Sequence, residues 1–231
     1  MKPISIFFAV LFWTAVIFDC VLLSSHNVQY RYASKLILMP LLFGIMVSEI
    51  ERTTKWWSVR IISVALLLSV IGDALLVNPE NLTIFMLGIL AFWIVQICYI
   101  IFFYRTLPFR KKDATFLFFA AIVILAYVLL MQFLMWDKLY DKHLYIPIII
   151  YSATIGFMLL TAANLSRSHR MRETAVMFFI PGAVLFIISD SLIALNEFYF
   201  SKPTSGVYIM LTYALAQFLI ILGAIKVINK K

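Results

Sequence analysis

Eight apolar runs, each about as long as one membrane crossing, follow one another along the chain. The hydrocarbon core of a bilayer is ~30 Å thick, and a helix of ~20 apolar residues crosses it while satisfying its own backbone hydrogen bonds. The chain is 64% hydrophobic and 13% charged, a balance that soluble domains do not show. We therefore expect an all-α, polytopic integral membrane protein of the cell (inner) membrane, with one transmembrane domain over residues 1–231. The expected spans are 4–23, 31–50, 56–77, 82–104, 115–136, 143–165, 173–195 and 205–228.

Basic residues gather on alternate sides of these spans. Of the 19 lysines and arginines, 14 lie at the two ends of the chain and in the loops 49–60, 105–113 and 166–172. The positive-inside rule therefore places both termini in the cytoplasm. No nucleic-acid partner is expected, because the basic residues are spread over many loops rather than gathered in one patch.

Two of the apolar runs carry an aspartate. Asp73 and Asp190 each lie about 17 residues into a span that runs outward, which puts both in the outer half of the membrane at 1.5 Å per residue. A carboxylate at that depth is costly and needs a cavity or a polar partner. The structural alternative is a hydrogen bond to Ser69, one turn before Asp73, or to the serines that flank Asp190. Two acids at matched depth favour a functional site.

Other polar residues fall in the same half of the membrane or near its middle. Lys35 has two interpretations: it extends to the outer interface, or it supplies a positive charge to an aspartate or a phosphate. Tyrosines in such spans usually pack as aromatics with a bonded hydroxyl. The candidate site comprises Asp73 and Asp190 as the catalytic pair, with Lys35, Tyr151, Asn196, Tyr213, Gln217, Gln96, Ser69 and Ser189 as candidate substrate-binding residues.

The two aspartates also indicate an internal repeat. The stretches "VIGDALL" and "IISDSLI" superpose aspartate on aspartate, four spans apart, and the next span in each half carries a glutamine, Gln96 or Gln217. Some membrane proteins are built from parallel repeats with the site between the halves. A parallel repeat of four helices plus four is therefore one hypothesis, and chance similarity between short apolar segments is the other.

Several other chemistries are disfavoured. The three histidines, His26, His143 and His169, lie at loops or span ends, so no metal site of the usual three-histidine kind is expected. No G-x-S-x-G sequence occurs, which disfavours a serine hydrolase. Intramembrane aspartyl proteases carry G-x-G-D, whereas this chain has V-I-G-D at Asp73. No cofactor is expected, and the remaining chemistry is what two carboxyl groups perform.

The order of the motifs resembles the YhhN-like lysoplasmalogenases, which are integral membrane hydrolases with eight helices. The resemblance is carried by "RYASKLILMPLL", "LLLSVIGDALLV", "GILAFWIVQICYI", "YSATIGFMLLTA" and "PGAVLFIISDSLIAL", with "MLTYALAQFLIILG" closing the chain. Members often have histidine where this chain has Gln96, and proline directly after the lysine that corresponds to Lys35. The resemblance implies that Asp73 and Asp190 are the catalytic pair.

It also implies cleavage of the vinyl ether bond of a 1-alkenyl lysophospholipid, giving a fatty aldehyde and a glycerophospho-alcohol. One carboxylic acid would protonate the alkene, and an ionised partner would stabilise the resulting cation, a division of roles that glycosidases also use. The expected partners are this lysophospholipid and membrane lipids, and the sequence carries no signal of oligomeric state. A proton-coupled transporter of a small or lipid-like substrate is the alternative, and a lipid-binding scaffold with structural acids is a third.

Overall fold

A computed structural model describes residues 2–25, 28–51, 55–77, 81–110, 114–141, 144–200 and 206–230. Most residues in these ranges are helical and none lies in a strand, and eight segments are long and apolar enough to cross a membrane. The all-α, multi-pass class is thereby confirmed. The helices are α1 (Pro3–Ser24), α2 (Val28–Leu36), α3 (Leu38–Glu49), α4 (Trp56–Leu76), α5 (Leu82–Thr106), α6 (Ala114–Asp141), α7 (Tyr145–Leu165), α8 (Arg172–Thr174), η2 (Ala175–Phe179), α9 (Ile180–Phe198) and α10 (Gly206–Asn229).

The second span is two helices rather than one. Helix α2 ends at Leu36 and α3 begins at Leu38, with Ile37 as a turn between them. Pro40 explains the break, because a proline has no N–H to donate to the carbonyl of Leu36 and its ring crowds that carbonyl. The expected single helix over 31–50 is therefore wrong in this detail, and the break lies next to Lys35.

The seventh span also departs from a regular helix. It runs from Arg172 to Phe198, longer than the expected 173–195, and contains the π-helical turn η2 over Ala175–Phe179. Pro181 follows directly, at the start of α9. A proline there cannot donate to the carbonyl four residues earlier, so the wider turn accommodates the missing bond.

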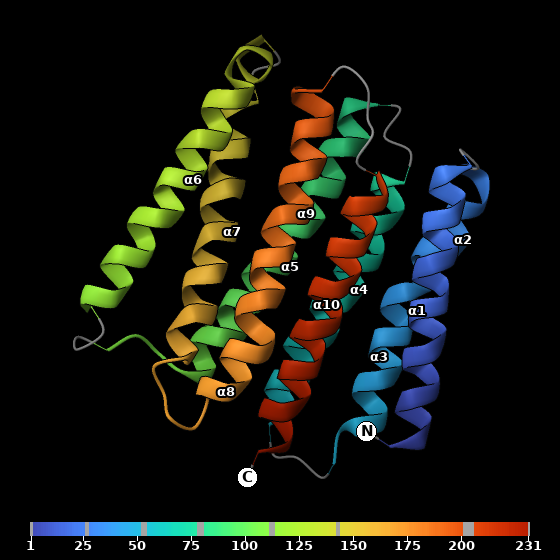
Figure 1. Cartoon of the computed structure of the whole chain (residues 1–231), viewed down its shortest axis with the longest axis vertical. Helices are drawn as coiled ribbons and strands as arrows, with labels where there is room; N and C mark the ends of the chain where they lie inside the picture. The colour runs from blue at the N-terminus through green and yellow to red at the C-terminus, as the bar shows by residue number, and fades with distance from the viewer. Residues whose placement is uncertain are drawn as a thin grey trace.

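The helices lie in three groups side by side (Figure 1). Helices α4, α5, α9 and α10 occupy the middle, α1 to α3 lie along one side, and α6 with α7 lies along the other. The main core runs through the middle group and is rich in aromatic rings such as Phe102, Phe179 and Phe186. Helix α6 is peripheral: it packs on α7 and α9, while side chains such as Phe133, which is 80% exposed, face outward.

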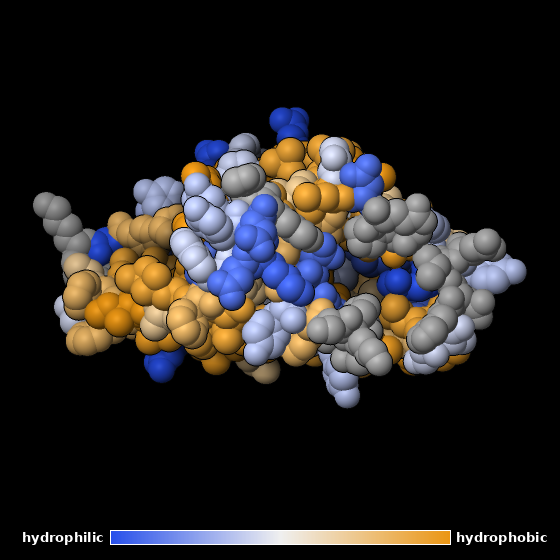
Figure 2. Space-filling model, turned by 90° about the horizontal axis from the view of Figure 1, so that it is seen from above, coloured by the Kyte–Doolittle hydropathy of each residue, from blue (hydrophilic) through white to orange (hydrophobic). Residues whose placement is uncertain are grey.

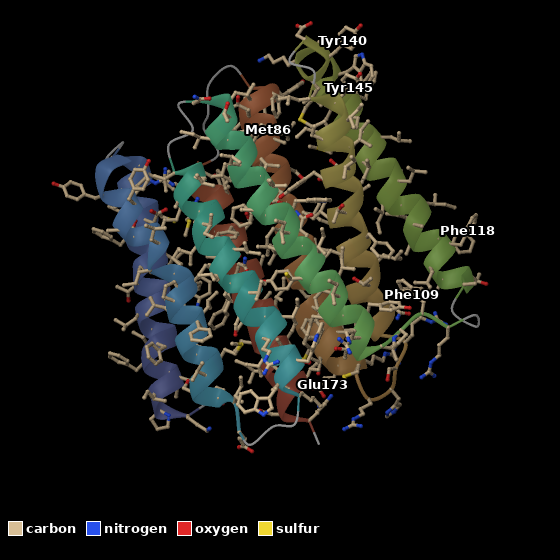
Figure 3. All side chains as sticks on the ribbon, turned by 180° about the vertical axis from the view of Figure 1, so that it is seen from behind. Met86, Phe109, Phe118, Tyr140, Tyr145 and Glu173 are labelled. Carbon is tan, nitrogen blue, oxygen red and sulfur yellow. The ribbon has the colours of Figure 1, made fainter. Side chains whose placement is uncertain are left out.

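The two ends of the chain lie at the same end of the bundle (Figure 1). Figure 3 shows Glu173 at this end and Tyr140 with Tyr145 at the opposite end. Several basic residues at the end with the termini lie over aromatic rings, as Arg105 does over Trp57 at 4.0 Å. Because both ends of the chain lie at the same end of the bundle, the number of crossings is even. The cytoplasmic location of both termini stays a prediction.

Candidate active site

Asp73 lies in the last turn of α4 and is 1% exposed. The ammonium Nζ of Lys35, from the last turn of α2, is 3.3 Å from Asp73 Oδ1, and the Tyr213 hydroxyl from α10 donates to Oδ2 at 2.8 Å. Lys35 therefore faces the aspartate rather than the interface, in agreement with its interpretation as a counter-charge. A buried cation this close favours the ionised carboxylate.

A separate short chain of hydrogen bonds lies one helical turn further along α10. Gln217, one turn after Tyr213 on α10, donates from Nε2 to the Ser69 hydroxyl at 3.1 Å and accepts from the Tyr99 hydroxyl at 2.5 Å. Ser69 in turn donates to the carbonyl of Ala65. All of these side chains are buried. Ser69 thus bonds to α10 rather than to Asp73, and the chain holds α4, α5 and α10 in register.

Asp190 lies in the middle of α9 and has a different set of partners. The Tyr151 hydroxyl of α7 and the Gln96 amide of α5 both donate to its Oδ2, the latter at 3.1 Å. Neither donor is charged, and no ion pair to Asp190 occurs among the described residues. The amide oxygen of Gln96 is buried and accepts no hydrogen bond within the part of the chain that the structure describes.

A cavity opens beside Asp190. Its wall is formed by α5, α6, α7 and α9 together with Leu76 of α4. Asp190, Tyr151 and Ser191 contribute polar groups, and most of the other lining residues are apolar. Asp190 is half-buried and is one of the residues that line this cavity.

The two aspartates therefore belong to two neighbouring polar clusters with different partners. Phe92 lies between them: its ring lines the Asp190 cavity, and its centroid is 5.6 Å from that of Tyr213, the partner of Asp73. Phe92 also lies against α4, since a Cβ at Gly72 would be 2.7 Å from its ring. Glycine at position 72 thus permits this ring to separate the clusters by a single aromatic layer.

The partners of the two aspartates follow a reciprocal pattern. Spans one to four form the first half of the chain and spans five to eight the second. Asp73 contacts Lys35 from the second span of its own half and Tyr213 from the last span of the other half. Asp190 likewise contacts Tyr151 from the second span of its own half and Gln96 from the last span of the other half. The spacing from 73 to 96 equals that from 190 to 213, which is 23 positions. This spacing pairs Gln96 with Tyr213 rather than with Gln217. It agrees with a four-plus-four repeat, which stays a prediction.

The remaining candidate residues lie nearby in different roles. Ser189 is buried and donates to the carbonyl of Ile209 at 3.2 Å, so it joins α9 to α10. Asn196 lies near the end of α9, six residues beyond Asp190, and is half-buried. Another buried acid, Asp19 of α1, accepts a hydrogen bond from Ser34 at 2.6 Å and lies 3.6 Å from Arg31 Nε. These contacts join α1 to α2.

Two site residues escaped sequence reasoning as functional candidates. Tyr127 of α6 hydrogen-bonds to Ser191, the residue after Asp190, and both line the cavity. Tyr127 lies in a run of apolar residues that is typical of a lipid-facing helix, so no sequence signal identified it. Ser191 carried a signal, since it follows Asp190 directly in S-D-S.

No group of three metal-ligating side chains occurs in the residues that the structure describes. His26 and His143 lie outside those residues, and His169 lies in the turn before α8. The expectation that the protein uses no metal stays a prediction.

The comparisons with known proteins agree with the motifs. The model of the YhhN family matches residues 30–224. A protein of Mycobacterium bovis named lysoplasmalogenase is 34% identical over 163 residues, which are 69% of this chain and 58% of that protein. A human protein named lysoplasmalogenase TMEM86A is 34% identical over 167 residues, 71% of this chain and 65% of its own length. The matched region thus spans about three fifths of these relatives. No solved structure matches the chain significantly.

Proposed function

Because this chain belongs to the YhhN family, we propose that it is a membrane-embedded hydrolase that cleaves the vinyl ether bond of a lysoplasmalogen. The relatives named lysoplasmalogenase support this activity. The observation that carries the proposal is the contrast between the two aspartates: Asp73 is buried beside a lysine, and Asp190 is half-buried among neutral donors at a cavity.

The reaction needs a proton donor and then water. Protonation of the alkene carbon beyond the one bonded to oxygen gives an oxocarbenium ion. Water adds to the carbon that bears the oxygen and loses a proton, and the resulting hemiacetal collapses. The products are a fatty aldehyde and the glycerophospho-alcohol, so one water molecule is consumed and the catalytic proton is returned.

Asp190 is the proposed proton donor. A carboxyl group that is buried among neutral partners retains its proton more readily than one beside a cation, and Asp190 faces the cavity. Tyr151 and Gln96 hold Oδ2, which leaves Oδ1 as the oxygen directed by neither bond. General acid catalysis by a placed side chain contributes about 10²–10⁴-fold to a rate.

Asp73 is the proposed ionised partner. Its pairing with Lys35 keeps a carboxylate one aromatic layer away from the cavity, where negative charge stabilises a developing oxocarbenium ion through a medium of low dielectric constant. Lys35 is also the proposed contact of the substrate phosphate, since it lies in the half of the bundle opposite the termini. The substrate enters sideways from the membrane.

The experiment is aldehyde release from lysoplasmalogen by the purified protein, measured by mass spectrometry. We expect activity without added metal and a loss of about 100-fold in Asp190→Asn and in Asp73→Asn. Asp19→Asn is the matched control, because it also removes a buried acid with polar partners but lies outside both clusters. Wild-type rates in both test variants would overturn the residue roles. Flux across liposomes without cleavage would favour the transporter instead.

A further inference from the structure

The Asp190 cavity has one polar end and an apolar remainder. Asp190, Tyr151 and Tyr127 mark the polar end, and Phe85, Met135 and Phe198 line the rest. Along α9, Asp190 and Phe198 are eight residues apart, which corresponds to about 12 Å. The cavity therefore extends from the carboxyl toward the end of the bundle that carries Tyr140 and Tyr145 (Figure 3).

Helix α6 separates this cavity from the surrounding membrane. Met131 and Met135 face the cavity, while Leu130 and Phe133 on the other face of the helix are exposed. Methionine side chains are unbranched and adapt to irregular shapes. The wall between the cavity and the membrane is thus one helix thick and lined on its inner face by adaptable groups.

The end of the bundle above the cavity has a matching division. Figure 2, which views this end, shows hydrophilic residues gathered over its middle and apolar residues on the side of α6 and α7.

We propose that the cavity between α5, α6, α7 and α9 binds the alkenyl chain of the substrate, and that Met131 and Met135 limit its length. This inference rests on the proposed hydrolysis of a lysoplasmalogen. The vinyl ether lies at the Asp190 end, and the hydrocarbon contacts the methionines of α6. The cavity favours a single chain, because its apolar part is bounded on the membrane side by α6.

A second apolar groove, between α3 and α4, provides the comparison. Met39, Phe43 and Leu67 line it, and it faces the membrane. Neither aspartate is among its lining residues. Bulk membrane lipid is the occupant that this groove fits, since a chain bound there meets no carboxyl group.

The first test measures kcat/KM over a homologous series of lysoplasmalogens from short to long chains. Met135→Phe fills the cavity, so long chains should lose about tenfold relative to short ones, at about fourfold per excluded methylene group. Met135→Ala should shift the preference toward longer chains. Leu67→Phe and Leu67→Ala are the matched controls in the α3–α4 groove, and their chain-length profiles should equal that of the wild type. Unchanged profiles in both Met135 variants, with the protein folded and active, would overturn the proposal.

The second test does not depend on turnover. An uncleavable 1-alkyl lysophospholipid with a diazirine at the end of its chain is bound and photolysed, and the labelled residues are mapped by mass spectrometry. Labels at Phe85, Met135 or Phe198 would support the chain site even if the protein cleaved nothing, in which case the proposed hydrolysis alone would fail. Labels at Phe43 or Leu67 in a protein that cleaves lysoplasmalogen would overturn the chain site alone.

Discussion

The ion pair between Lys35 and Asp73 makes a quantitative prediction. Both side chains are buried, at 11% and 1% exposure, and Nζ is 3.3 Å from Oδ1. Removing one partner of a buried pair leaves the other charge without compensation and costs about 3–5 kcal/mol, whereas replacing both partners together is often nearly neutral. Lys35→Met keeps the apolar stem of the side chain, and Asp73→Asn keeps the shape of the carboxyl group.

We therefore expect a strong coupling in the double-mutant cycle. Each single variant should lower the free energy of unfolding by about 3 kcal/mol or more, and the double variant should recover at least about 2 kcal/mol of the summed loss. The free energy is measured by reversible unfolding in mixed detergent micelles, followed by circular dichroism. Aldehyde release is measured on the same samples, and we expect Lys35→Met also to raise KM for a phosphate-bearing substrate.

A small coupling would contradict this reasoning. Hydrogen bonds between membrane helices couple by about 0.6 kcal/mol on average, so a value at or below that level would mean that the two charges do not meet as a buried pair. Lys35 would then extend to the interface. A strong coupling with an unchanged KM would keep the ion pair but remove Lys35 from the substrate contact.

Three further predictions follow from the backbone and the ends of the bundle. Gly72→Ala should lower kcat/KM by about tenfold or more, because the new Cβ would lie 2.7 Å from the Phe92 ring that separates the two clusters. Gly206→Ala is the control: its neighbour is the flexible tip of Leu23, so activity should be unchanged. Pro40→Ala should restore the hydrogen bond to the Leu36 carbonyl, join α2 to α3 and draw Lys35 away from Asp73. Activity should therefore fall, while the helix content measured by circular dichroism should not. An active variant with a straight second span would refute the role of the break. The topology is tested in a background in which Cys20 and Cys98 are replaced. In intact cells Asp141→Cys should react with an impermeant maleimide and His169→Cys should not, because the two positions are exposed at opposite ends of the bundle. The reverse labelling pattern would invert the topology.

The spans were predictable because each is long, apolar and bounded by charge. The breaks within the spans were harder to predict. A proline such as Pro40 inside an apolar run either kinks a helix or ends it, and the packing of neighbouring helices decides between these outcomes. The extension of α6 to Asp141 was not predicted. Trp136 and Tyr140 both lie within the helix, where their ring centroids are 6.2 Å apart.

The aspartates were recognisable individually, but their partners were not. Gln96 and Asp190 are 94 positions apart, and Tyr213 and Asp73 are 140 apart. Side-chain contacts over such distances depend on which helices are neighbours and on how each is rotated. Tyr127 shows the same limit, since its hydroxyl is functional in the proposed site only because α6 packs against Ser191.

The sequence by itself determined the class of this protein, because a run of ~20 apolar residues has a helix across the membrane as its only stable form. It also determined which groups are costly enough in that setting to need partners, namely Asp73, Asp190 and Lys35. Only the tertiary structure decided that the lysine pairs with Asp73 and that Asp190 faces a cavity among neutral donors. That decision depends on helix packing, which places residues by neighbourhood and rotation rather than by their order in the chain, and it makes two similar carboxyl groups chemically different.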